Sequence, residues 1–225
     1  MRELCAGVNI DLGTAAAFRE QWAREAGPID SDYNTRPVPL LLKTNQAPGD
    51  AVVMTAAIYS LHRAHPGRYA TAVDSLWPEV FAHNPDVVPT ESILDAAPIQ
   101  MHYPAIHKSN ERGIHFMQGW CEFLGSALNT QIPLLTNRPR LYFNRPAPQE
   151  CYWVVCSGGK SDFTNKLWGQ HNYQAVIDAT KGVTYIQVGG DAKDHQKLDG
   201  VVYSVGKTNL RQLFKLVRRA RGVVC

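Results

Sequence analysis

The sequence lacks the apolar segments that insert into membranes. Its longest apolar stretches, Val52–Tyr59 and Tyr152–Cys156, fall far short of the roughly 20 residues that span a bilayer. The amino terminus, MRELCAGVNIDLG, has no basic start followed by an apolar run, so we expect no secretory signal. These absences predict a soluble, cytoplasmic protein.

The sequence also lacks the motifs of common metal, hydrolase and dinucleotide sites. It contains no HxH, HExxH or GxSxG spacing, and no GxGxxG follows the first predicted strand, which disfavours an NAD-dependent enzyme. Val154 stands where a Walker A loop would need its first glycine. The cysteines are too scattered for a zinc site and are expected to be free thiols: Cys5, Cys121, Cys151, Cys156 and Cys225. We therefore expect neither a metal nor a bound cofactor.

The composition is that of a folded protein with a real core. Of its 225 residues, 44% are hydrophobic and 19% charged. A net charge of +3 is too small to indicate a nucleic-acid partner. The length exceeds one typical domain and falls short of two.

Strand-like and helix-like segments alternate along two parts of the chain. We interpret residues 1–36 as an N-terminal extension with a helix at Thr14–Glu25. Residues 37–148 then give a buried strand ending at Lys43, a helix over Ala51–Ala64, the strand YATAVD, a helical SLWPEVFAH, the strand PIQMHYP and an amphipathic helix over Asn110–Asn129. Such alternation predicts a Rossmann-like domain with a parallel sheet.

A second, shorter alternation follows a segment rich in Pro, Arg and Asn. That segment, Ile132–Glu150, is predicted to be an interdomain linker. Residues 149–225 contain the strand YWVVC, the helix HNYQAVIDAT, the strands TYIQVGG and VVYSVG, the helix NLRQLFKLVRRA and the strand GVVC. The fold class predicted is α/β with two Rossmann-like domains, the second one incomplete because its last strand ends the chain.

The loop after the first strand, KTNQAPGDAVV, is expected to line a cleft, because ligands bind at the carboxyl ends of parallel strands. Gly49 permits close backbone approach, and Asp50 stands at the start of a helix. Asp50 is either a reactive carboxylate or an N-cap that stabilises the helix by about 1 kcal/mol. The residues assigned to this acceptor-side loop are Lys43, Thr44, Asn45 and Gly49.

Three further loops follow strands of the second half. CSGGKSDFTNKLWG can offer backbone N–H groups and lysines to a phosphate, although its glycines also fit a flexible turn. The turns VGGDAKDH and VGKTNLRQL could lie near a nucleotide or be ordinary turns, with Thr208 or Asn209 capping the last helix. One side of that helix is basic. We interpret it as a solvated face, with attraction to an anionic membrane as the alternative: Arg211, Lys215, Arg218 and Arg219.

Taken in order, these segments resemble glycosyltransferase family 9, the ADP-heptose lipopolysaccharide heptosyltransferases. The similarity runs through LLLKTNQAPGDAVVMTAAIYSLHRAHPG and NPDVV and resumes at VVCSGGKSDFTNKLWGQHNYQAVID, TYIQVGG and GKTNLRQLFKLVRRARGVV. It implies the GT-B fold and inverting transfer of a heptose-like sugar from a nucleotide-diphosphate sugar. The acceptor implied is a glycan, lipid-linked or protein hydroxyl, reached with peripheral contact to the inner membrane.

The resemblance also implies roles for particular residues. Asp50 corresponds to the general base, and Lys166 to the lysine that contacts the phosphates of the donor, with Trp168 packed beside it. The usual proline after that tryptophan is Gly169 here, and either Asp191 or Asp194 corresponds to an acidic residue at the donor sugar or ribose. The donor-binding residues predicted together are Lys166, Gly158, Gly159, Lys160, Gly189, Asp191, Lys207 and Thr208.

The family pattern continues after its GVV strand with a D-S/T-G-x-x-H loop at the nucleotide, whereas this sequence stops at Cys225. We therefore expect a C-terminally truncated second domain. The alternative to an active enzyme is a degenerate, non-catalytic GT-B remnant with a binding role.

Overall fold

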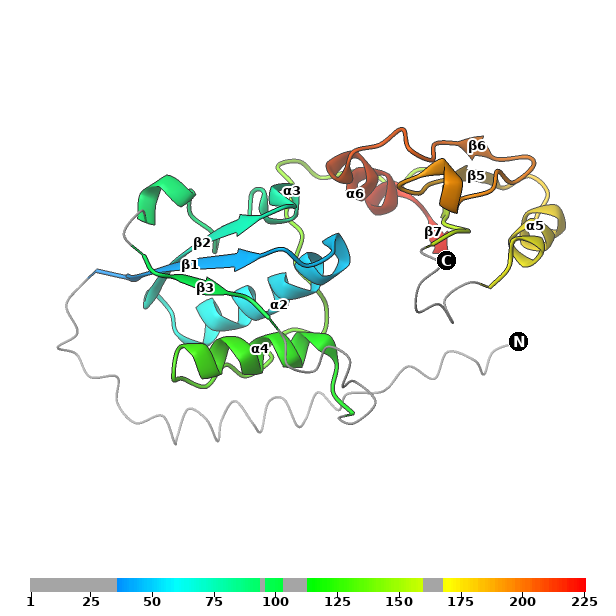
Figure 1. The fold of residues 1–225 in the computed structure, drawn as a ribbon. Coiled ribbons are helices and arrows are strands. Elements are labelled where there is room, and N and C mark those ends of the chain that lie inside the picture. Colours follow the sequence, from blue (N-terminus) through cyan, green and yellow to red (C-terminus); the bar gives the residue numbers. More distant parts are fainter. Residues whose placement is uncertain (1–35, 94–95, 103–112, 160–167) are drawn as a thin grey trace, which may run out of the picture. The chain divides into compact units, whose positions relative to one another are not determined.

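The computed structural model describes residues 36–93, 96–102, 113–159 and 168–225 (Figure 1). Residues 37–225 form one compact unit, which is described here. The expected N-terminal extension and its helix at Thr14–Glu25 lie outside the described residues, as do Lys160 and Lys166 of the predicted donor loop.

The first half of this unit contains a parallel three-stranded sheet in the order β2-β1-β3. Its strands are β1 (Val38–Thr44), β2 (Tyr69–Ser75) and β3 (Pro98–Gln100), with Leu42 opposite both Val73 and Ile99. Helix α2 (Pro48–Ala64) joins β1 to β2. The alternation of strand and helix in the sequence therefore produces the predicted parallel sheet.

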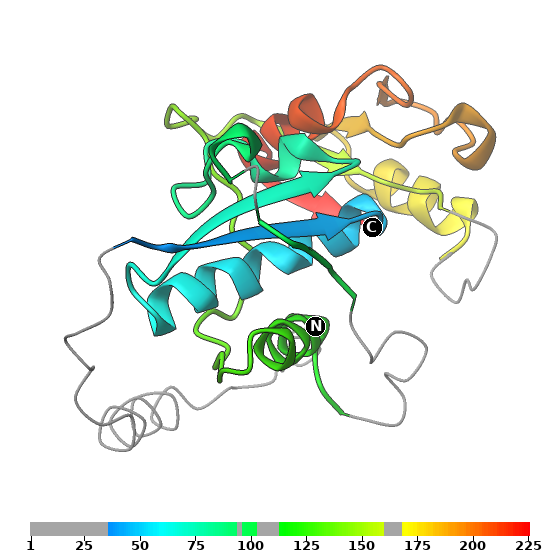
Figure 2. The same cartoon turned by 60° about the vertical axis from the view of Figure 1, so that its left-hand side comes forward.

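Helices α2 and α4 (Phe116–Ala127) bury the apolar face of the sheet (Figure 1 and Figure 2). The apolar residues of α4 recur every three or four positions and lie on one side of that helix, whereas α2 is buried around most of its circumference. The largest fully buried side chains of this core are Leu42, Met54, Ile58, Leu61, Met101, Trp120 and Leu124.

Two helices of this half are shorter than the sequence pattern predicts. The helix expected from Asn110 begins at Phe116, because the side chain of His115 caps it by accepting a hydrogen bond from the backbone N of Met117 at 3.1 Å. The predicted helical stretch SLWPEVFAH contains only α3 (Pro78–Phe81). It ends there because His83 has a left-handed backbone with φ of 63°.

The second half contains a parallel four-stranded sheet in the order β6-β5-β4-β7. Its strands are β4 (Tyr152–Val155), β5 (Thr184–Gln187), β6 (Val202–Tyr203) and β7 (Gly222–Val224). Helices α5 (Gln170–Ala179) and α6 (Leu210–Arg219) and the short 3-10 helix η2 (Ala192–Asp194) complete this half. A second 3-10 helix, η1 (Thr90–Ile93), belongs to the first half.

Alternate residues of β4 enter two different cores. Tyr152 and Val154 pack in a cluster with Leu213 and Leu216 of α6. Val155 lies in a second cluster with Tyr173 of α5, and Trp153 packs against that cluster. Because successive strand residues point to opposite faces, this sheet is covered by helices on both sides, as in a Rossmann-like domain.

The predicted linker, Ile132–Glu150, has no regular secondary structure and is held to α2 by hydroxyl groups. The buried Ser60 hydroxyl accepts from the backbone N of Leu135 at 3.0 Å, and Thr55 accepts from the backbone N of Arg140 at 2.8 Å.

No helix in the described ranges is long and apolar enough to cross a membrane.

Candidate functional site

The loops after β1 and β2 are tied together at the carboxyl edge of the first sheet. Lys43 and Asp74 are register partners, and their side chains form an ion pair at 3.2 Å. The indole N–H of Trp77 donates to the backbone O of Gln46 at 2.9 Å. The buried Thr44 hydroxyl accepts from the backbone N of Gln46 at 3.4 Å. Of the predicted acceptor-side residues, Lys43 and Thr44 thus form the fixed end of β1, Asn45 lies in the loop and Gly49 is the second residue of α2.

Asp50 is the third residue of α2, so its interpretation as an N-cap is wrong. The N-cap is Ala47, which is extended and makes no side-chain capping bond, and Pro48 begins the helix. Proline suits that position because its missing N–H would have no helical partner. Asp50 is half-buried in the first turn, where the helix dipole favours a negative charge. The start of α2 therefore does not depend on Asp50 as its cap.

Gly49 is not required by the packing of the protein. It is exposed, and a side chain there would meet no protein atom within 4 Å. The described part of the protein therefore leaves room for a side chain at this position.

Two predicted donor-binding glycines, Gly158 after β4 and Gly189 after β5, enclose the buried ring of His195. A Cβ atom at Gly158 would lie 2.5 Å from Nδ1 of His195, and one at Gly189 would overlap three atoms of the ring. The exposed fraction of His195 is only 6%. The structure therefore gives both glycines a packing reason that the sequence did not reveal.

Gln187, the last residue of β5, connects the loops around His195. Its amide N donates to the Ser157 hydroxyl at 2.9 Å and to the backbone O of Gln196 at 2.8 Å. Its amide O accepts from the backbone N of Leu198 at 3.0 Å. A fully buried amide with three partners fixes the carboxyl edge of the sheet.

Asp191 and Asp194, the alternatives for the acidic donor residue, both lie at η2 and are exposed. The Asp191 carboxylate accepts from the backbone N of Lys193 at 3.0 Å and pairs with the Lys193 ammonium at 3.3 Å. The hydrogen bond from the Lys193 backbone holds the pKa of Asp191 below its ordinary value.

The turn after β6 joins the same edge. The backbone N of Gly206 donates to the backbone O of Gly189 at 3.0 Å, so the two predicted nucleotide turns are neighbours. The ammonium of Lys207 donates to the backbone O of Tyr203 at 2.9 Å. Thr208 follows in this turn, between Lys207 and the helix cap.

Asn209, and not Thr208, caps α6. Its side chain accepts from the backbone N of Gln212 at 2.8 Å, and the Gln212 side chain accepts from the backbone N of Asn209 at 2.9 Å. This reciprocal pair is a capping box, which satisfies two N–H groups at the helix start.

Removal of this cap is expected to destabilise the protein modestly. Asn209→Ala should lower the free energy of unfolding in urea by about 1 kcal/mol, because an amide N–H loses its acceptor. Asn209→Asp retains an acceptor and should remain near the parent. An alanine variant as stable as the parent would contradict the capping role.

Trp168 lies just before α5, where the sequence departs from the family pattern. Its ring is 52% exposed and meets the Tyr173 ring edge to face, with centroids 5.2 Å apart. Gly169 has φ of 93°, which a proline fixed near −65° could not adopt. A proline at this position would therefore not fit the backbone that leads into α5.

The second-half residues Gly158, Gly189, Asp191 and Lys207 thus come together at one sheet edge, with Gly159 beside Gly158 in the sequence. His195 and Gln187 were missed because neither belongs to a motif. A signal existed for His195, since it follows the VGG turn by only a few residues.

Among the described residues, no group of three or more His, Cys, Asp or Glu gathers as a metal site.

Neither a protein-family model nor a curated protein matches this sequence. Solved structures do match its fold. The iron-containing dodecameric glycosyltransferase TibC from enterotoxigenic E. coli aligns with a TM-score of 0.59 and 16% identity, over 87% of this chain and 55% of TibC. A family 9 glycosyl transferase from Veillonella parvula gives 0.63 and 11%, over 84% of this chain and 75% of that one.

E. coli heptosyltransferase WaaC, solved with ADP-2-deoxy-2-fluoro heptose, gives a TM-score of 0.55 and 14% identity, over 83% of this chain and 82% of WaaC. The chain has the fold of GT-B glycosyltransferases. The fold class implied by the sequence resemblance is therefore confirmed. Because the sequence identities are only 11% to 16%, the similarity shows a shared fold alone. The chain spans about half of the length of TibC, at 55%.

Proposed function

We propose that the protein is an inverting glycosyltransferase that takes a nucleotide-diphosphate sugar, with ADP-heptose as the leading donor. The observation that carries this proposal is the shared fold with glycosyltransferases over 83% to 87% of the chain. One of those neighbours, TibC, was also solved in complex with ADP-D-beta-D-heptose. The acceptor is a glycan, lipid-linked or protein hydroxyl, and lipopolysaccharide synthesis is the process in which such a transfer fits.

The proposed reaction is a direct displacement at the anomeric carbon. Asp50 removes the proton of the acceptor hydroxyl as its oxygen attacks, and the bond between the anomeric carbon and the diphosphate oxygen breaks. The electron pair of that bond leaves with the nucleoside diphosphate, and the configuration at the carbon inverts. Fixed positive charge and backbone N–H groups stabilise the departing diphosphate, so no step requires a metal.

The placement of the described residues supports this division of roles. Asp50 lies in the first turn of the helix after β1 of the first sheet, and Gly158, Gly189 and Lys207 follow strands β4, β5 and β6 of the second. In parallel α/β sheets the carboxyl ends of strands carry the ligand sites. The acceptor base and the donor-binding loops thus belong to different sheets.

Calorimetry with ADP, ADP-heptose and NAD tests the donor class. The two ADP compounds should bind the protein encoded by the full open reading frame more tightly than NAD does. Tighter binding of NAD would contradict the proposal. ADP-heptose binding without turnover, for any acceptor tested, would favour the non-catalytic remnant.

Lys166 is expected to act on the donor. Lys166→Ala should weaken donor binding by about 1.5 kcal/mol, or about tenfold, which is the contribution of one charge-assisted hydrogen bond. Lys181→Ala is the matched control, because Lys181 is an exposed lysine at the end of α5 and its loss changes the net charge equally. An unchanged donor dissociation constant in Lys166→Ala would exclude this role.

A further inference from the structure

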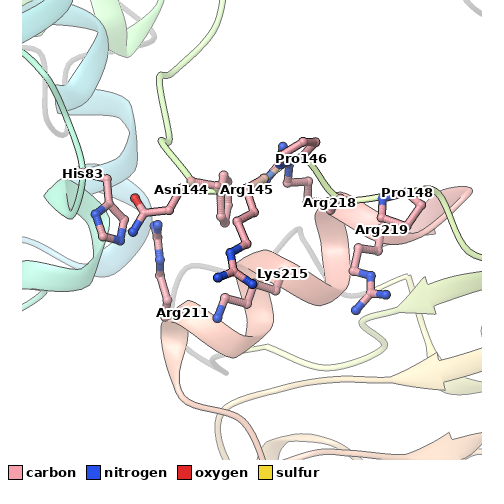
Figure 3. A pocket seen from close by; sticks show the side chains of 11 residues that line it. His83, Asn144, Arg145, Pro146, Pro148, Arg211, Lys215, Arg218 and Arg219 are labelled. Carbon is pink, nitrogen blue, oxygen red and sulfur yellow. The ribbon is translucent and has the colours of Figure 1, made fainter.

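The basic side of α6 faces the linker across an open pocket of about 740 Å³ (Figure 3). Four of its lining residues, Arg211, Lys215, Arg218 and Arg219, repeat at the spacing of one helix face. Linker residues 143–148 form the facing wall, and His83 lies at one end. The sequence predicted a solvated basic face here, but the linker covers part of it.

Two arginines hold the linker in place. The guanidinium carbons of Arg211 and Arg218 each lie 4.4 Å from the centroid of the Phe143 ring. Arg211 also donates to the backbone O of Tyr142, and Arg218 donates to the backbone O of Arg145 at 2.9 Å. Contacts with an aromatic face and with carbonyl groups orient these side chains but leave their charges uncompensated.

The remaining basic side chains are directed into the same pocket. Figure 3 shows Arg145 extending from the linker toward the side of α6 that carries Lys215. Both residues are exposed, and within the described ranges neither side chain forms an ion pair or a hydrogen bond. Their cationic groups are therefore available to a ligand.

The pocket holds an excess of positive charge. None of its lining residues is acidic, and of its five Lys and Arg side chains only Arg219 has a carboxylate partner in the described part of the chain, Glu150. Burial, with the nearby charge of Arg218, lowers the pKa of Arg211. Like charges held this close repel, and an anion bound between them would relieve that repulsion.

The dimensions of the pocket indicate what kind of anion fits. Arg211 and Arg219 are separated by eight residues of helix, which is about 12 Å at the usual rise per residue. Pockets of about 300 to 1,000 Å³ hold small organic ligands, so a single phosphate would fill only a part of this one. Arginine forks match the paired oxygens of phosphate groups.

We propose that the pocket between the linker and α6 binds a molecule that carries two or more phosphate groups. The Arg219 end of this pocket lies away from the predicted donor loops, whereas Arg211 at the other end follows the predicted donor turn of Lys207 and Thr208. Glu150, whose backbone N donates to the backbone O of Arg219 at 2.7 Å, precedes β4, whereas Gly158 follows the other end of that strand. The inference does not rest on the proposed glycosyl transfer, since it uses only the pocket and its charges.

Tripolyphosphate is the probe for this site. Calorimetry at near-physiological salt should detect its binding to the 225-residue protein. Arg145→Gln and Lys215→Gln should each weaken that binding by about tenfold, as expected for the loss of one charge-assisted contact to phosphate. Both side chains are exposed and form no ion pair or hydrogen bond within the described ranges, so the variants should unfold in urea like the parent. Lys181→Gln, with the same change in net charge, should stay within about twofold of the parent.

Vesicles of phosphatidylcholine with and without cardiolipin, a lipid that carries two phosphate groups, distinguish a lipid headgroup from a soluble ligand. Sedimentation with the cardiolipin vesicles that is lost in Lys215→Gln would assign the site to a phospholipid. Tripolyphosphate binding without vesicle binding would assign it to a soluble phosphorylated molecule.

Three results would overturn the proposal. The first is the absence of binding to both tripolyphosphate and the vesicles. The second is an affinity for tripolyphosphate that stays within about twofold of the parent in Arg145→Gln and Lys215→Gln, or that falls as much in Lys181→Gln as in those two variants. The third is a loss confined to Lys166→Ala, which would place tripolyphosphate in the predicted donor loop.

Discussion

Replacement of Asp50 by asparagine is expected to reduce turnover by about 10²-fold or more, because an amide cannot take a proton from the acceptor hydroxyl. Its effect on stability should be small. Asp50 is the third residue of α2 and does not cap it, so the change leaves the cap in place and weakens the favourable interaction between its charge and the helix dipole. That interaction contributes about 0.3 to 1 kcal/mol.

Two measurements separate these effects. Urea denaturation gives the free energy of unfolding, and product formation from ADP-heptose gives turnover, both with the protein encoded by the full open reading frame. Asp50→Glu is the matched control, because it retains the negative charge in the first turn and moves the carboxylate by one methylene group. It should be as stable as the parent, yet slower, since a displacement of about 1 Å can cost 10²-fold in rate.

Near-parental turnover of Asp50→Asn, with α2 intact, would remove Asp50 from the mechanism. The fold would be unaffected by that result, because it rests on the sheets and on the similarity to solved structures. A loss of turnover in both variants together with a large loss of stability would instead indicate that Asp50 supports the loop after β1.

The strands and most helices were predictable because their signals are local. An apolar run such as LLL in β1 is typical of strands in a parallel sheet, and the turns between elements carry Gly, Pro and Asn. Helix ends were harder to predict. The start of α4 depends on the His115 side chain, and the end of α3 depends on the left-handed backbone at His83.

The candidate site was predicted less completely, because its side chains come from distant parts of the chain. The sequence placed Asp50 at a helix start, but the position of the cap at Ala47 depends on where Pro48 begins the helix. The packing of Phe143 between Arg211 and Arg218 joins residues about seventy positions apart. No periodicity within one segment reports such a contact.

His195, in a loop beside the second sheet, belongs to no sequence motif. Its buried ring is the reason for the second large effect that we expect, a loss of stability when Gly189 is replaced. Its buried ring occupies the space that side chains at Gly158 and Gly189 would need. The neighbouring Gly190 differs, because a Cβ atom there meets no protein atom within 4 Å. The variants Gly189→Ala and Gly190→Ala can therefore be compared directly, because they have the same composition and the same net charge.

Gly189→Ala is expected to lower the free energy of unfolding by about 3 kcal/mol, which is the upper end of the usual cost of overpacking. The cost is high because the new methyl group would overlap three atoms of the buried His195 ring. Gly190→Ala should remain within about 0.5 kcal/mol of the parent or be slightly more stable, since alanine restricts the unfolded chain. Urea denaturation without any donor measures both, so donor binding does not contribute. The decisive comparison repeats Gly189→Ala in a His195→Ala background, where the ring is gone and most of the cost should disappear. An equal cost in both backgrounds would show that Gly189 is required for its backbone and not for the space that it leaves to His195.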